Sequence, residues 1–168
     1  MRARILFISV VILGGAVTFV THLNAQKTEQ LYGTWRLIKY TRTIVATGET
    51  QAVFGKMPVG FVNYGRDGRM MAIVVSEKRS APTDPVHVTD AERAELYKTM
   101  FAYAGTFDFD GTTITHHVDV SYNQTWTATD LIRKVKFDAG RLILTTVPAI
   151  SNIDGQMTFA VLTWERVR

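Results

Sequence analysis

The segment Val59–Val75, VGFVNYGRDGRMMAIVV, contains the clearest structural signal in the chain. Two apolar stretches rich in β-branched and aromatic residues flank Gly65-Arg66-Asp67-Gly68. Glycine adopts the positive φ angles that tight turns between antiparallel strands require. The segment therefore predicts a β-hairpin with strands at 59–64 and 69–75.

Similar patterns occur on both sides of this hairpin. Short segments of alternating or β-branched residues end at turn signals such as Asp110-Gly111 and Asp138-Ala139-Gly140. The predicted strands are 34–41, 51–54, 59–64, 69–75, 106–109, 112–122, 126–137, 141–147 and 157–167. About 8–10 closely spaced strands are typical of an up-and-down barrel or a sandwich, and closure into a barrel removes unpaired edges. We expect an all-β antiparallel barrel.

One short helix interrupts the strands. Thr89-Asp90-Ala91-Glu92 is a capping-box sequence, and Tyr97, Met100, Phe101 and Ala104 follow at the spacing of one helical face. Gly105 stands where a glycine often ends a helix. The sequence predicts a mid-chain helix that begins after Thr89 and ends at Gly105.

The first 25 residues have the pattern of a signal peptide. Arg2 and Arg4 precede an apolar run of 16 residues, 5–20, and Ala25 supplies a small residue before Gln26. An uncleaved membrane anchor is the alternative, although the run is shorter than the ~20 residues that span a bilayer core. We expect a signal at 1–25, one domain at 26–168 and a periplasmic or secreted location without membrane insertion after cleavage.

Composition excludes several classes of function. The chain has no cysteine, so cysteine nucleophiles, thiolate metal sites and dithiol redox chemistry are excluded. Its formal net charge of +4 falls by two when Arg2 and Arg4 are removed, and the remaining charges are interspersed. No basic stripe of the kind that binds nucleic acid is present, no cofactor motif is found, and the oligomeric state is left open.

Two segments at opposite ends of the domain resemble lipocalin-type barrels. Gly33-x-Trp35 resembles the opening strand of such barrels, and Trp164-Glu165-Arg166 resembles the last one. The resemblance implies that Arg166 lies across Trp35 and closes the barrel floor together with Gly33. A guanidinium over an indole contributes about 0.5–2 kcal/mol.

The chain is more closely similar to the smaller lipocalin-like domain family of bacteria and fungi. The similarity is carried by Phe54-Gly55, Pro58-x-Gly60, Tyr64 with Asp67-Gly68-Arg69-Met70, Tyr103-Ala104-Gly105-Thr106, His116-His117-Val118, Trp126 followed by Arg133, and Leu162–Arg166. The mid-chain helix also favours this family over ordinary lipocalins. One departure is Ala128, where such domains tend to carry glycine after the tryptophan. The family implies a lipocalin-like β-barrel and, at most, binding of a small organic molecule.

His116 and Arg133 are the most interesting polar residues. Strand alternation places His116 on the inner face with Ile114, Val118 and Val120, and Arg133 on the inner face of another strand. His116 is a hydrogen-bond donor to a ligand or a general base, or else a core histidine satisfied by its neighbours. Arg133 pairs with a ligand carboxylate, or else with an internal acid such as Asp108.

The other candidate ligand contacts are Tyr64, Met70, Tyr103, Trp126 and Arg79, each of which is also compatible with a structural role. No metal site is expected, because His116 and the neighbouring His117 point to opposite faces of a strand.

Three functions remain open on the sequence alone. The first is an exported barrel that holds a small apolar or amphipathic molecule, with its polar end at His116 and Arg133. The second is an isomerase, cyclase or dehydratase that uses His116 as acid or base and Arg133 to stabilise an oxyanion. The third is a structural envelope barrel filled by its own side chains.

Overall fold

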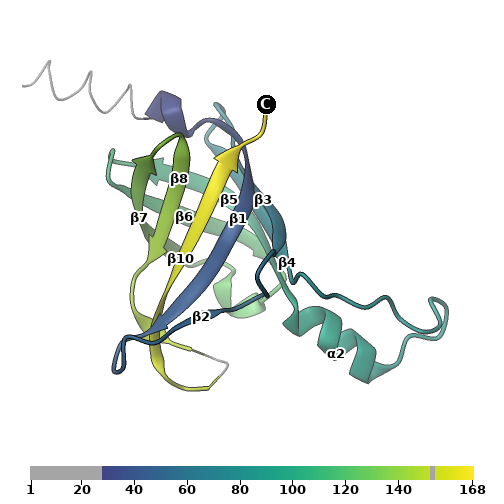
Figure 1. Cartoon of the computed structure of the whole chain (residues 1–168). Helices are drawn as coiled ribbons and strands as arrows, with labels where there is room; N and C mark the ends of the chain where they lie inside the picture. The colour runs from purple at the N-terminus through teal and green to yellow at the C-terminus, as the bar shows by residue number, and fades with distance from the viewer. Residues whose placement is uncertain (1–27, 152–153) are drawn as a thin grey trace, which may run out of the picture.

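The computed structural model describes residues 28–151 and 154–168 (Figure 1). The expected signal peptide at 1–25 lies outside the described residues. Within the described part of the chain, no helix is long and apolar enough to cross a membrane.

Eight antiparallel strands close into a barrel, which confirms the expected fold. They are β1 (Gly33–Ile44), β3 (Val59–Tyr64), β4 (Arg69–Val75), β5 (Met100–Phe109), β6 (Thr113–Ser121), β7 (Asp130–Asp138), β8 (Arg141–Thr146) and β10 (Met157–Arg166). Each strand pairs with the next in this order, and β10 pairs with β1 to complete the circle. The short strands β2 (Thr50–Ala52) and β9 (Ala149–Ile150) extend the wall beside β1 and β10 (Figure 1).

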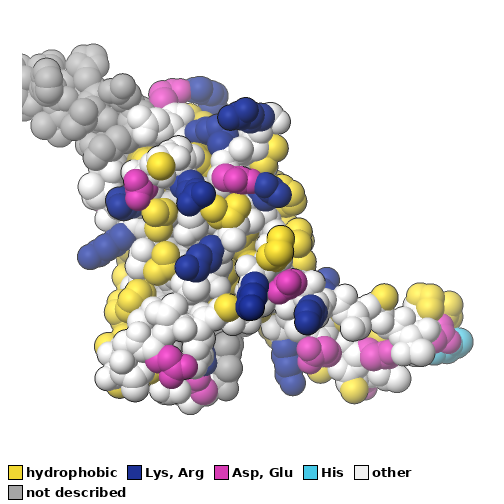
Figure 2. All heavy atoms as spheres, in the orientation of Figure 1, with side chains coloured by type: hydrophobic (Ala, Val, Ile, Leu, Met, Phe, Trp, Pro, Cys, Tyr) yellow, Lys and Arg dark blue, Asp and Glu magenta, His cyan; other side chains and the backbone are white. Residues whose placement is uncertain are grey.

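The β3–β4 hairpin forms as expected, with Gly68 at φ +79° in its turn. Inward side chains of all eight strands build one apolar core, in which Trp35, Val62, Leu142 and Trp164 are almost completely buried. On the face shown in Figure 2, basic and acidic side chains are interspersed, and α2 (Asp90–Lys98) projects from the barrel as an arm.

The prediction that the helix extends to Gly105 is wrong. Helix α2 begins with the expected capping box of Thr89 and Glu92 but ends at Lys98. From Met100 the chain is strand β5, in which Phe101 and Tyr103 face inward with a period of two. Phe101 fits both the helical spacing and the strand alternation, so packing in the barrel determines that this segment is a strand.

Gly105 is therefore not a helix cap. A Cβ atom there would lie 1.8 Å from the backbone oxygen of His117 on β6. This is the position of a β-bulge between β5 and β6, so the two strands approach too closely for any side chain.

Two bulges change which residues face inward. In β1, Ile38 is an extra residue between Leu37 and Lys39, so Tyr40 and Arg42 continue the inner face. In β6, the bulge at Asp119 turns Val120 outward, where it is 60% exposed. The expectation that Val120 shares the inner face of His116 is therefore wrong.

The link before β7 is longer than expected. Trp126 lies in a short 3₁₀-helix, η1 (Gln124–Trp126), and β7 begins at Asp130 instead of Trp126. In between, Ala128 has φ +61°, a left-handed conformation that glycine adopts without strain. The position where glycine is usual in the similar family is thus one where the backbone favours it.

Candidate functional site

One end of the barrel, called here the closed end, is built around Trp35. The guanidinium carbon of Arg166 lies 4.2 Å from the centre of the Trp35 ring, and the indole N–H donates to the backbone oxygen of Leu31 at 2.8 Å. Arg166 also donates to the backbone oxygens of Gln30 and Tyr32. A Cβ on Gly33, where φ is +117°, would lie 2.9 Å from the Arg166 guanidinium. The structure thus places Gly33, Trp35 and Arg166 together across the barrel floor.

A cavity of about 480 Å³ occupies the barrel above this floor and extends to the opposite end, called here the mouth. This volume is within the range of pockets that hold small organic molecules. Apolar residues from several strands form much of the wall, among them Val62, Ala72, Phe101, Leu144, Leu162 and Trp164. The side chains of the barrel therefore leave space at the mouth end, which favours the first two sequence hypotheses over the third.

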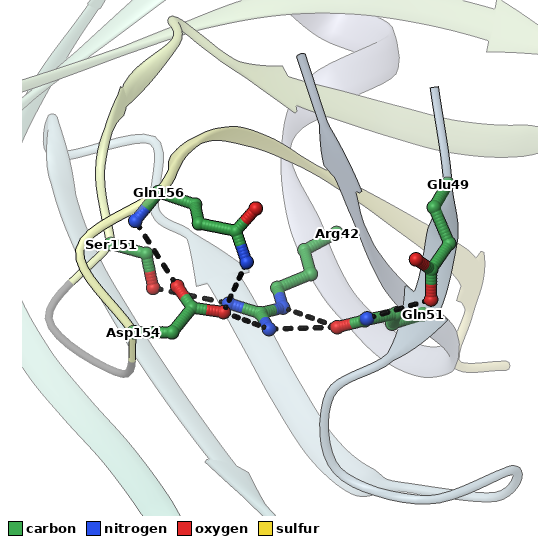
Figure 3. Close-up of polar contacts among 6 residues, drawn as sticks. All are labelled: Arg42, Glu49, Gln51, Ser151, Asp154 and Gln156. Carbon is green, nitrogen blue, oxygen red and sulfur yellow. Dashed lines mark hydrogen bonds and ion pairs between the residues drawn. The ribbon is translucent and has the colours of Figure 1, made fainter. Parts of the chain in front are cut away.

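Two arginines line the cavity, and Arg42 is fully engaged at the mouth (Figure 3). It forms an ion pair with Asp154 at 2.6 Å and donates twice to the side-chain oxygen of Gln51 and once to Ser151. Gln156 in turn donates to the Asp154 carboxylate. This network joins β1, β2 and the segment that precedes β10, and it neutralises the charge of Arg42.

Arg133, by contrast, has no acidic partner among the described residues. Its single hydrogen bond there runs from Nη1 to the backbone oxygen of Leu131, at 2.8 Å. Asp108, the internal partner that the sequence suggested, instead contacts His117 on the outer surface. The guanidinium carbon of Arg133 lies 5.6 Å from the centre of the Tyr103 ring. A partly buried cation with unused donors therefore faces the cavity.

His116 lies beside the cavity, completely buried. Its Nε2 is 2.9 Å from the Tyr64 hydroxyl and its Nδ1 is 3.0 Å from the Tyr103 hydroxyl. Burial, and secondarily the positive charge of Arg133, hold the pKa of His116 well below its usual range, so the imidazole is neutral. Burial likewise raises the pKa of both tyrosines, which keeps them protonated. His116 thus has the satisfied core environment that the sequence left as one of two alternatives.

The predicted ligand contacts separate into two groups. Tyr103, Trp126 and Arg133 line the cavity, and Trp126 packs edge-on against Tyr103 with ring centres 6.0 Å apart. Tyr64, Met70 and His116 are buried in the barrel interior and are not part of the cavity lining. Arg79 is remote from the cavity: it lies against α2 and donates to the backbone oxygen of Leu96.

Sequence reasoning missed several polar residues of the lining, among them Arg42, Tyr40 and Trp164. Tyr40 lines the cavity with a hydroxyl that makes no hydrogen bond to any described residue, and burial raises its pKa to about 12. Trp164 also lines the cavity, and its indole N–H has no acceptor among the described residues. The bulge at Ile38 concealed Tyr40, because strict alternation from Trp35 places it on the outer face.

The outward-facing His117 lies between two carboxylates. Its Nδ1 lies 2.7 Å from the Asp130 carboxylate, and its Nε2 lies 3.0 Å from the Asp108 carboxylate. These two contacts raise the pKa of His117. Asp119, which follows on β6, pairs with Arg69. In the part of the chain that the structure describes, no group of three or more His, Asp and Glu side chains is placed to hold a metal ion.

Comparison with known proteins gave a family and a structural neighbour. The sequence model of the lipocalin-like domain family matches residues 32–167. A crystal structure of a lipocalin-like protein from Bacteroides uniformis aligns with 82% of this chain and 99% of that chain, with 16% sequence identity and a TM-score of 0.44. No functionally curated protein matches the chain.

Proposed function

The chain belongs to the lipocalin-like domain family, and on that premise we propose that it binds a small amphipathic molecule whose anionic or carbonyl end contacts Arg133. The apolar tail lies along the cavity wall. The proposal takes up the first of the three sequence hypotheses and keeps Arg133, but not His116, as the contact for the polar end.

The guanidinium of Arg133, which has no acidic partner in the described part of the chain, is the single observation that carries this proposal. A charge withdrawn from water costs several kcal/mol unless another charge or several hydrogen bonds compensate it. Arg42 shows how the same barrel compensates an arginine, through Asp154 and Gln51. Arg133 has one backbone hydrogen bond and an aromatic face instead. An acceptor group on a bound molecule would complete its coordination.

The apolar wall supports an amphipathic molecule over a small ion. Residues such as Phe101, Leu144 and Leu162 cannot hydrogen-bond to a ligand, whereas each buried methylene contributes about 0.8 kcal/mol. A 480 Å³ cavity has room for a chain of many atoms. Affinity should therefore increase with tail length as long as the tail stays inside the barrel.

Calorimetric titration of the chain with octanoate and with decanoate tests the proposal. Decanoate has two more methylenes, so we expect its Kd to be about tenfold lower. The heat-capacity change on binding should be negative, because apolar surface is removed from water. Equal affinities for the two acids, or no binding of either at millimolar concentration, would contradict the proposal.

Export remains a proposal that rests on residues 1–25 alone. The basic Arg2 and Arg4, the apolar run and the small residue at Ala25 support cleavage before Gln26. Intact-mass measurement of the protein purified from its own host tests this. A mass corresponding to residues 26–168 is expected, and a full-length mass would favour the uncleaved anchor.

A further inference from the structure

The buried row Tyr64–His116–Tyr103 contains one proton more than its hydrogen bonds use. A neutral imidazole has one donor and one acceptor, and each tyrosine hydroxyl has one proton. The row therefore holds three mobile protons, while only two hydrogen bonds join its members. The spare proton lies on Tyr64 if His116 donates from Nε2, and on Tyr103 if His116 donates from Nδ1.

The surroundings of the two tyrosines differ. Tyr64 is 1% exposed and packs edge-on against Phe107, with ring centres 5.0 Å apart. No described residue other than His116 hydrogen-bonds to its hydroxyl. A spare proton on Tyr64 would therefore be a buried donor without an acceptor, which is costly. Tyr103, in contrast, lines the cavity, where a bound molecule can accept its proton.

We propose that His116 is a positioning residue: its Nε2 accepts a hydrogen bond from the Tyr64 hydroxyl, and its Nδ1–H donates to the Tyr103 oxygen. The hydroxyl hydrogen of Tyr103 is then free to point into the cavity. Tyr103 and Arg133 then form a donor-only site that accepts a carboxylate and discriminates against head groups that must themselves donate. This inference rests on the proposed function and names the ligand class for that site.

The positions of Arg133 and Tyr103 support a site that both residues form together. The Arg133 guanidinium lies over the Tyr103 ring, so both groups border the same part of the cavity. Arginine has only donors, and a carboxylate has only acceptors. A carboxamide of the same shape has two N–H groups, and these would find no acceptor on Arg133 or on a Tyr103 oxygen that already accepts from His116. An unpaired polar group discriminates strongly between otherwise similar ligands.

The first test reads the tautomer of His116 in the full-length wild-type chain. Two-dimensional NMR of protein labelled with ¹⁵N-histidine shows which ring nitrogen carries the proton, and the His116→Gln variant identifies the His116 signals. A proton on Nδ1 is expected. A proton on Nε2, or on both nitrogens, at neutral pH overturns the inference whatever the protein binds.

The second test compares decanoate with decanamide by calorimetry. We expect wild-type protein to bind decanoate at least tenfold more tightly than decanamide. The Tyr103→Phe variant removes only the hydroxyl and should reduce that ratio at least fivefold. Tyr122→Phe is the matched control, because Tyr122 is not part of the cavity lining, and it should leave the ratio unchanged.

The outcomes separate this inference from the function beneath it. If neither compound binds to wild-type protein, the proposed function fails and the ligand class fails with it. If decanoate binds but the ratio is near one, or is the same in Tyr103→Phe, the proposed function stands and the donor-only site is wrong.

Discussion

Replacement of Arg133 by methionine separates a ligand-binding role from a structural one. Methionine keeps much of the length of the side chain but removes the charge and all five N–H donors. In the structure these donors have one backbone acceptor, the oxygen of Leu131, and the guanidinium lies over the Tyr103 ring. The substitution should therefore change affinity for an anion far more than it changes folding.

The two magnitudes follow from these contacts. Hydrogen bonds to a charged group contribute about 1.5–3 kcal/mol, which corresponds to a roughly 10- to 150-fold increase in the Kd for decanoate. For the unliganded protein, loss of one hydrogen bond and one cation–π contact costs about 1.5–2 kcal/mol. Relief of an unpaired, partly buried charge offsets this cost fully and can exceed it by up to about 2 kcal/mol. The free energy of unfolding should therefore stay constant or increase by up to about 2 kcal/mol.

Both quantities can be measured on the same samples. Calorimetric titration with decanoate and with decanol gives the affinities, and urea denaturation gives the free energy of unfolding. Decanol keeps the tail but lacks the charge, so its Kd should change less than threefold. Lys134→Met is the matched control, because it removes the same charge from the next residue, whose side chain is exposed on the outer face.

The opposite pattern would refute this reasoning. A variant that loses more than 1 kcal/mol of stability but binds decanoate as the wild type does would assign Arg133 to the architecture of the barrel. An equal loss of affinity for decanoate and decanol would mean that the substitution had altered the cavity itself.

Three further predictions concern stability. Gly105→Ala should lower the free energy of unfolding by about 2 kcal/mol or more, because its Cβ would overlap a backbone oxygen, whereas Gly140→Ala, with open space around it, should lose only about 1 kcal/mol; urea denaturation measures both. Ala128→Gly should raise it by about 0.5 kcal/mol, because relief of the left-handed strain exceeds the added flexibility of the unfolded chain, and the melting temperature should rise. Stability should also decrease as pH falls below about 6.5, because the unfolded chain then protonates His116 and the folded chain does not. The raised pKa of His117 affects the free energy of unfolding with the opposite sign in both proteins. The comparison is therefore between wild type and His116→Gln: the free energy of unfolding of the variant should depend less steeply on pH below about 6.5.

The β3–β4 hairpin and the capping box were predictable because local signals carry them. Turn residues such as Gly68 and the hydroxyl–carboxylate pair Thr89 and Glu92 act within a few residues of themselves. The same is true of alternation in β7, where Arg133 faces inward and Lys134 outward as expected.

The errors arose where two strands determine the outcome together. The bulges at Ile38 and Asp119 depend on how β1 meets β10 and how β5 meets β6, and each shifts the inner face by one residue. The glycine at position 105 was explained locally as a helix cap, but it is required because a backbone oxygen of another strand leaves no room for a side chain.

The candidate site was predicted only in part: Tyr103, Trp126 and Arg133 line the cavity, whereas the other predicted contacts, Tyr64, Met70, His116 and Arg79, do not. His116 and Arg133 both face inward, as alternation indicates, yet His116 bonds to two tyrosines while Arg133 faces the cavity. A hydrogen-bond partner such as Tyr64, which is 52 residues away from His116 in the chain, cannot be inferred from local patterns.

A crystal structure of the chain with bound decanoate tests the binding site most directly. The carboxylate should lie within hydrogen-bonding distance of Arg133 and the Tyr103 hydroxyl, with the alkyl chain along the apolar wall inside the barrel. Decanoate in the reverse orientation with its carboxylate at Arg42 in the mouth, or bound outside the barrel, would contradict the proposed function.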